Sequence, residues 1–127
     1  MIQRISFENF KSFRHAELPL VPLTFLVGAN GSGKSNAVEA IQLLSWLGSG
    51  RRLEDLPSAI AAGEVGLRGS LTDLSQAGSI SLACRILTSW APPEADYSLT
   101  LEAGRGGLRM TGERLESPAF GALHETP

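Results

Sequence analysis

Hydrophobic and polar residues alternate with a period of two at the start of the chain. Ile5 and Phe7 alternate with polar neighbours, which predicts a half-buried first strand over residues 2–7. The basic and aromatic residues at 9–15 then predict a turn. A second short alternating segment surrounds Pro19, and because proline cannot donate a ladder hydrogen bond, we expect this strand at the edge of a sheet.

The pattern of hydrophobic residues then changes twice. Residues 22–27 form a nearly continuous apolar run, which is typical of a strand buried on both faces. Residues 34–47 contain neither Gly nor Pro and are mostly apolar, which predicts a helix that ends at Gly48. The few polar residues of this helix fall on one stripe, so we expect most of its surface to be buried against a sheet.

The second half of the chain returns to a period of two. After a polar stretch at 51–62, which we expect to form a small helix or an ordered linker, alternating segments follow near residues 65–71, 80–86, 97–101 and 108–110. Turn-forming residues separate these segments, which predicts an antiparallel meander and disfavours a repeated βαβ series. We therefore divide the chain into a core at 1–50, a linker or short helix at 51–62, an antiparallel β-subdomain at 63–116 and a frayed tail at 117–127.

Composition narrows the classes of protein. The chain has 127 residues, which suffices for one modest core, and its net charge of −2 disfavours a protein that coats nucleic acid by bulk charge. Cys84 is the only cysteine, which excludes an intramolecular disulfide and a cysteine-based metal site. No secretory leader pattern and no apolar run of membrane-spanning length occurs, so we expect a cytoplasmic protein without membrane contact.

A phosphate-binding motif lies between the predicted buried strand and the helix. Residues 28–35 read Gly-Ala-Asn-Gly-Ser-Gly-Lys-Ser and match the P-loop pattern G-x-x-x-x-G-K-[ST] in full. Its glycines let the backbone wrap closely around phosphate oxygens, and its amides point inward at the positive end of the helix. Lys34 would reach the β- and γ-phosphates of a nucleoside triphosphate, and the hydroxyl of Ser35 would coordinate Mg²⁺.

The first 47 residues combine this motif with two further features. The segment Glu8-Asn9-Phe10-Lys11-Ser12-Phe13-Arg14 follows the opening strand, and the P-loop continues into Asn36 and then Glu39-Ala40-Ile41. This arrangement resembles the N-terminus of SMC/RecF/OLD-type ATPases, in the ABC-type branch of P-loop ATPases and the wider AAA family. The resemblance implies an α/β fold, an N-terminal α+β lobe with a mixed sheet around the P-loop helix, followed by an antiparallel β-meander.

The same resemblance implies roles for individual residues. Asn36 would touch the α-phosphate of ATP, and Asn30 would lie near the γ-phosphate. The segment from Lys11 to Arg14 would approach adenine and ribose, although a solvated basic turn is an equal alternative. The ATP-binding residues implied in this way are Gly28, Ala29, Asn30, Gly31, Ser32, Gly33, Lys34, Ser35, Asn36, Lys11, Ser12 and Arg14.

The resemblance also implies partners. These ATPases bind ATP with Mg²⁺ and dimerise head to head, so the expected partners are ATP and either the C-terminal lobe of the same ATPase or a second ATPase copy. DNA is a further expected partner of a full assembly.

Two motifs that hydrolysis needs in this family are missing from the sequence. No run of four apolar residues ends in Asp-Glu, so we find no Walker B strand. Residues 74–78 are similar to the signature motif Leu-Ser-Gly-Gly, but an alternating strand pattern follows them, which favours a hairpin turn. We therefore expect the N-terminal lobe of a longer ATPase, either a fragment or a truncated product, which binds ATP without hydrolysing it alone.

Two other functions are compatible with a P-loop. A regulatory nucleotide-binding module that pairs with a full-length ATPase would have the same fold. A small P-loop kinase would need parallel βαβ repeats, which the meander disfavours.

Overall fold

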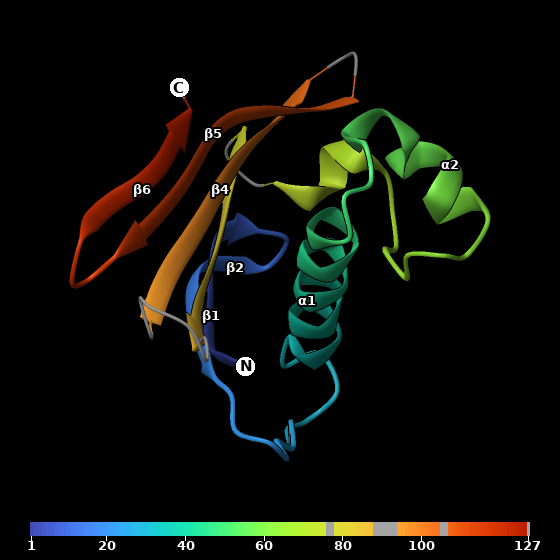
Figure 1. The fold of residues 1–127 in the computed structure, drawn as a ribbon. Helices are drawn as coiled ribbons and strands as arrows, with labels where there is room; N and C mark the ends of the chain where they lie inside the picture. Colours follow the sequence, from blue (N-terminus) through green and yellow to red (C-terminus); the bar gives the residue numbers. More distant parts are fainter. Residues whose placement is uncertain (76–77, 88–93, 105–106, 127) are drawn as a thin grey trace.

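A single antiparallel sheet dominates the fold. The computed structural model describes residues 1–75, 78–87, 94–104 and 107–126. Within them, the strands lie in the order β2-β1-β3-β4-β5-β6. The strands are β1 (Ile2–Phe10), β2 (Phe13–Pro19), β3 (Ser79–Leu87), β4 (Glu94–Gly104), β5 (Gly107–Ser117) and β6 (Gly121–Thr126). The helices are α1 (Lys34–Gly48) and α2 (Leu56–Ala61), with 3₁₀ turns η1 (Leu53–Asp55) and η2 (Leu71–Leu74). Figure 1 shows α1 beside the sheet and α2 beyond one end of α1.

The pairing of the strands confirms the predicted meander and corrects the predicted mixed sheet. Strands β3 to β6 pair in sequence order, and every pair in the described residues is antiparallel. β1 lies between β2 and β3, so the first hairpin joins the same sheet as the meander. β2 is an edge strand, as Pro19 predicts. The segment between β2 and β3 carries the P-loop and both helices, and this connection brings α1 to the sheet.

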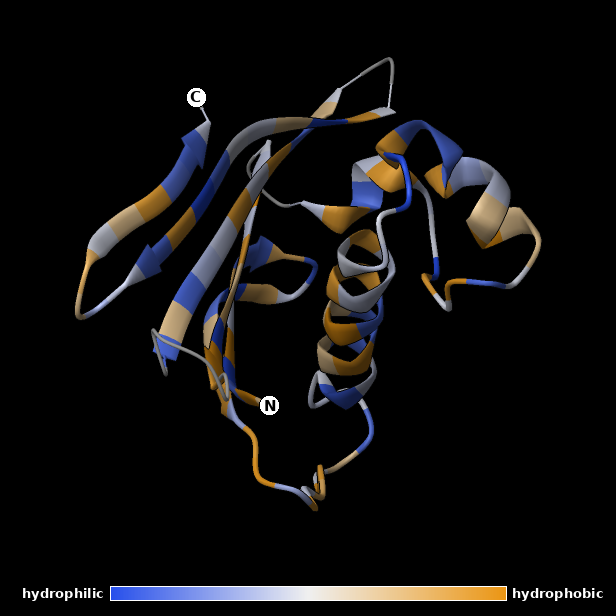
Figure 2. Ribbon diagram, in the orientation of Figure 1, coloured by the Kyte–Doolittle hydropathy of each residue, from blue (hydrophilic) through white to orange (hydrophobic). Residues whose placement is uncertain are grey.

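The core forms between α1 and the sheet. Figure 2 shows hydrophobic bands along the strands and along α1. The side chains that are most completely buried come from β1, α1, α2, η2, β3 and β4, namely Phe7, Phe10, Ile5, Leu43, Leu56, Leu74, Ile80, Leu82, Leu99 and Leu101. Burial of each such side chain contributes about 1.5–3 kcal/mol before opposing terms, so this layer is the main stabilising feature of the fold.

The first hairpin is tighter than the sequence predicts. The predicted turn at 9–15 is wrong in extent, because β1 continues to Phe10 and β2 begins at Phe13, which pair with each other. Asn9 has a φ of 53°, which Asn tolerates better than most residues, and Phe10 is fully buried beyond it. The connection is therefore reduced to Lys11 and Ser12.

The predicted buried strand at 22–27 is absent. These residues form no strand, and the side chains of Leu23, Phe25 and Val27 are 69%, 77% and 91% exposed. Figures 1 and 2 show this stretch leaving the sheet as a largely hydrophobic segment before it turns into α1. A strand buried on both faces needs neighbouring strands and two covering layers, and none of the six described strands pairs with this segment.

Three further predictions need correction. The alternating residues near 65–71 form no strand; Val65 and Leu67 are buried in an irregular segment that leads into η2. The predicted frayed tail contains β6, which pairs with β5. The helix extends through Gly48, and Gly50, with a φ of 78°, supplies the left-handed residue beyond its end.

The helix α2 and the turn η1 lie within residues 51–62, for which a small helix or an ordered linker was expected. The division of the chain into four segments stays a prediction. No helix of the described residues combines the length and the apolar character that crossing a bilayer requires.

Candidate functional site

The P-loop lies between the exposed segment and the first turn of α1. Two of its glycines adopt left-handed backbone conformations: Gly31 has a φ of 79°, and Gly33, at the N-cap of α1, has a φ of 91°. An L side chain rarely adopts such values, so the loop conformation requires glycine at these positions. The predicted transition from loop to helix at residues 33–34 is therefore present.

The N-terminus of α1 is electrostatically suited to an anion. No side chain caps it, and its first turn contains no acidic residue. The amides of a first helical turn lack intrahelical partners and carry the positive end of the helix dipole. The loop therefore presents unneutralised backbone donors next to a lysine, the arrangement that a phosphate group needs.

Lys34 folds back over the loop. Its ammonium group donates to the backbone carbonyls of Gly28 and Ala29, the latter at 2.7 Å, and lies 3.3 Å from Oγ of Ser32. The positive charge of Lys34 therefore lies against the loop. The oxygens of a bound phosphate group would take the place of these uncharged acceptors. The residues present fit a triphosphate, with Lys34 as the point charge and the loop amides as the surrounding donors.

A groove extends from the P-loop along α1. It has a volume of about 480 Å³ and is lined by Leu26, Lys34, Ser35, Val38, Glu39, Gln42, Gly66 and Arg68. Ser35 is exposed there, which suits the predicted role of its hydroxyl as a ligand of Mg²⁺. The groove joins the P-loop to the segment before η2, a neighbourhood that the sequence pattern did not predict.

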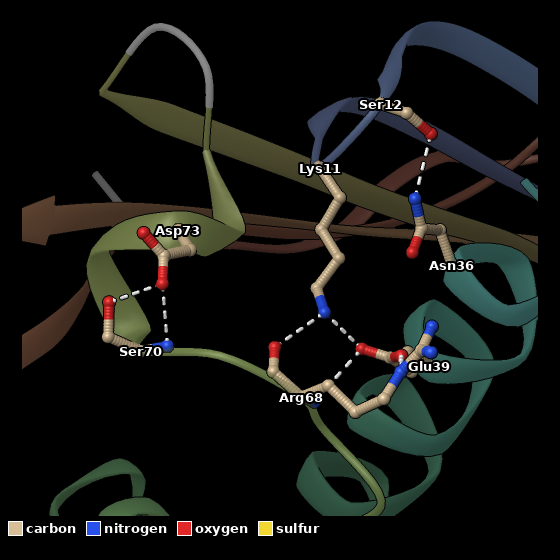
Figure 3. A network of polar contacts seen from close by, with 7 residues as sticks. All are labelled: Lys11, Ser12, Asn36, Glu39, Arg68, Ser70 and Asp73. Atoms are coloured by element: carbon tan, nitrogen blue, oxygen red, sulfur yellow. Dashed lines mark hydrogen bonds and ion pairs between the residues drawn. The ribbon is translucent and has the colours of Figure 1, made fainter. Parts of the chain in front are cut away.

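The buried Glu39 is the centre of a partly buried ion network on this side of α1 (Figure 3). The ammonium group of Lys11 forms an ion pair with Glu39 and donates to the backbone carbonyl of Arg68 at 2.7 Å. Arg68 in turn donates to Glu39 through Nε at 2.6 Å and through its backbone amide at 3.2 Å. The carboxylate therefore joins three segments: the β1–β2 turn, α1 and the segment that precedes η2.

The hydrogen bonds of this network lower the pKa of Glu39. Burial by itself would raise the pKa of this carboxyl group, but hydrogen bonds from Lys11 and Arg68 oppose burial and hold the pKa below its ordinary value. Glu39 is only 3% exposed, whereas its neighbour Val38 is 43% exposed. The polar residue thus faces inward and the apolar residue outward, the reverse of what the hydrophobic pattern alone suggests.

The structure brings some of the predicted residues together and separates others. Asn36 donates through Nδ2 to Oγ of Ser12 at 2.8 Å, so the turn and the helix start are in direct contact. Arg14 is exposed, and because strand side chains alternate, it points to the face of β2 opposite Phe13. The proposed contacts of Lys11, Ser12 and Arg14 with adenine and ribose stay predictions.

Two residues of the site were missed by the sequence pattern. The sequence pattern places Glu39 on a predicted helix and Arg68 in an alternating segment, and it gives neither residue a role in binding. The only available sequence signal is the spacing of Ser35, Glu39 and Gln42 on one polar stripe of an otherwise apolar helix.

Comparisons with known proteins show similarity in the part of the chain that carries this site. Residues 1–53 match the family described as AAA ATPase domain. The chain is 44% identical over 57 residues to the DNA replication and repair protein RecF of Streptomyces avermitilis, a match that covers 44% of this chain and 15% of that protein. It is 38% identical over 81 residues to RecF of Acidothermus cellulolyticus, covering 58% of this chain and 22% of that protein.

A solved structure supports the fold. The chain matches a structure from work on ATP-driven dimerization and DNA-stimulated activation of SMC ATPases, with a TM-score of 0.61 and 22% sequence identity. The match covers 97% of this chain and 72% of that chain. The predicted resemblance to SMC- and RecF-type ATPases is therefore confirmed, while the chain spans less than a quarter of the length of the RecF relatives.

Proposed function

We propose, from the likeness of this chain to SMC- and RecF-type ATPases, that it is an ATP-binding N-terminal lobe. It would bind the triphosphate of ATP with Mg²⁺ through Gly28, Ala29, Asn30, Gly31, Ser32, Gly33, Lys34, Ser35 and Asn36. The observation that carries the proposal is the first turn of α1, which no side chain caps, which contains no acidic residue and which begins with Lys34 directly after the left-handed Gly33.

The lobe would complete its site with a partner. Residues 21–27 carry exposed apolar side chains, and none of the described strands pairs with them. We propose that this segment becomes a strand when a C-terminal lobe, or the corresponding lobe of another ATPase copy, supplies neighbouring strands. In a head-to-head dimer such lobes would enclose ATP, and the assembly would act on DNA.

The lobe alone would bind ATP without hydrolysing it. Lys34 and the loop amides supply phosphate contacts, whereas hydrolysis also needs a carboxylate that orients the attacking water. Glu39 is the carboxylate among the residues that line the groove, and its oxygens already accept hydrogen bonds from Lys11 and Arg68.

Calorimetric titration with ATP and Mg²⁺ tests the proposal. Lys34→Ala should weaken binding at least about tenfold, because a charge-assisted contact to the phosphates is lost. Arg109→Ala is the matched control, because it removes a basic side chain from an exposed ion pair with Glu102 on the meander. Equal ATP affinity in the wild type and in Lys34→Ala would contradict the assigned site.

A phosphate-release assay tests the second part of the proposal. The purified wild-type chain should release no more phosphate from ATP than Lys34→Ala. Steady release by the wild type that is lost in Lys34→Ala would show that the chain is a complete ATPase.

A further inference from the structure

Three consecutive residues, Lys11 and Ser12 of the β1–β2 turn and Phe13 at the start of β2, contact three positions at the start of α1. Phe13 lies against Gly33, Ser12 accepts a hydrogen bond from Asn36, and Lys11 pairs with Glu39. The helix positions are spaced by three residues, so they follow one side of the helix. From Phe13 to Ser12 to Lys11, each residue therefore contacts α1 about one helical turn further from its N-terminus.

The contact at Gly33 is steric. A Cβ atom on Gly33 would lie 2.6 Å from Cζ of Phe13, closer than such atoms approach one another. The ring of Phe13 is itself held in an edge-to-face contact with Phe7, whose ring centre is 5.1 Å away and which is buried in the core. The core of the sheet therefore limits, through two rings, where the backbone of the P-loop can lie.

The contact at Glu39 is electrostatic and partly shielded from water. The side chains of Lys11 and Glu39 are 11% and 4% exposed. Ion pairs with this little exposure are screened less than surface pairs and hold their geometry better. The amide of Lys11 also donates to the carbonyl of Leu74 at 2.8 Å, which fixes the turn to η2.

We propose that residues 11–13, at the β1–β2 turn, hold the phosphate loop in position. This positioning depends mainly on Phe13, which lies against Gly33, and on Glu39, which pairs with Lys11. Neither residue needs to touch the nucleotide: Phe13 fixes the backbone at the N-cap, and Glu39 fixes the direction of the first two turns of α1. Phosphate binding requires donors held within a fraction of an ångström, which a loop by itself does not provide. The consequence for ATP affinity rests on the proposed function, whereas the consequence for the loop itself does not.

Hydrogen exchange of single amides tests the proposal without a ligand. The amide of Ala37 donates to the carbonyl of Gly33 at 2.9 Å and reports whether the first turn of α1 is closed. In Glu39→Gln and in Phe13→Leu this amide should exchange about tenfold faster, because local opening becomes easier. The amide of Ser49, which donates to the carbonyl of Ser45 at the other end of α1, should keep its rate.

Asp96→Asn is the matched control for Glu39→Gln. It removes one carboxylate charge from an ion pair with Arg85 on strands β3 and β4, away from the P-loop. It should leave exchange at Ala37 unchanged. If Glu39→Gln does not fold, Ser12→Ala, which removes only the hydrogen bond from Asn36, provides the same test.

The outcomes separate the two proposals. Faster exchange at Ala37 alone supports the positioning role, and unchanged exchange in folded variants, or equal acceleration at Ala37 and Ser49, overturns it. Calorimetry then adds the functional part: weaker ATP binding by Glu39→Gln but not by Asp96→Asn is expected. A wild type that binds no ATP would reject the proposed function, while the exchange rates would still decide the role of the turn.

Discussion

The ring of Phe13 occupies the space in which a side chain on Gly33 would lie. A Cβ atom at this glycine would be 2.6 Å from Cζ of Phe13 and 3.1 Å from Cε1. The φ of Gly33, 91°, independently disfavours any L residue. The P-loop glycine at the N-cap is thus required twice, once by its own backbone and once by a residue of β2.

Gly33→Ala should destabilise the fold more than Gly31→Ala. Gly31 has a similar φ of 79°, but nothing lies within 4 Å of a Cβ atom there, so its substitution adds backbone strain of about 1–3 kcal/mol and no clash. Chemical denaturation of both variants measures the difference. Adding Phe13→Ala to Gly33→Ala should relieve the steric part of the loss, and strictly additive losses in the double variant would contradict the clash.

The stability of the chain should depend on pH through Glu39. Its pKa is lowered in the folded state, so its ionised form stabilises the fold above the unfolded pKa of about 4.3, and this contribution is lost as the pH falls through the folded pKa. The difference in unfolding free energy between wild type and Glu39→Gln should therefore shrink as the pH falls below about 5. Other carboxyl groups titrate in both proteins and cancel, so a constant difference would contradict the network.

Tyr97, the only tyrosine of the chain, should ionise at unusually high pH. Burial raises the pKa of its phenol, and the hydrogen bond that the hydroxyl donates to Glu113 at 2.8 Å raises it further. Because the folded state retains the phenol proton more tightly, the free energy of unfolding should fall as the pH rises above about 10. Ultraviolet absorbance of the phenolate measures the titration directly.

Glu113→Ala provides the control for this titration. It should lower the pKa of Tyr97 toward its ordinary value, while His124→Ala, which removes a weaker neighbour 3.7 Å from Glu113, should change it less. Equal titration curves in the wild type and Glu113→Ala would show that the hydrogen bond to Glu113 does not contribute to the raised pKa of Tyr97.

Truncation of two phenylalanines should change the stability by very different amounts. Phe25 is 77% exposed, so Phe25→Ala should change the unfolding free energy by less than about 0.5 kcal/mol and should reduce binding of a hydrophobic dye. Phe10 is fully buried, so Phe10→Ala should cost about 3–5 kcal/mol. A large loss of stability in Phe25→Ala would mean that residues 21–27 pack within this chain.

Local patterns predicted the elements whose sequence signal lies within their own segment. The helix at 34–47, the edge position of the strand with Pro19 and the order of the meander depend on periodicity, backbone restrictions and short connections, all of which are readable along the chain. The P-loop motif was equally readable, because its glycines, Lys34 and Ser35 stand at fixed spacing within eight residues.

Long-range contacts account for the predictions that failed. Residues 22–27 have the composition of a buried strand, but a strand needs partner strands, and none of the described strands pairs with them. The tail at 121–126 has little periodicity, yet β5 offers it hydrogen-bonding partners. In both cases the state of the segment depends on what lies beside it.

The sequence by itself determined the P-loop motif, the helix that follows it and the resemblance to ATPases, because these depend on residue type at fixed local spacing. Only the tertiary structure decided that Glu39 faces inward to Lys11 and Arg68, and that Phe13 limits the position of Gly33. These contacts join residues far apart in the chain, and their energies depend on burial and distance, which exist only once the sheet and α1 have packed together.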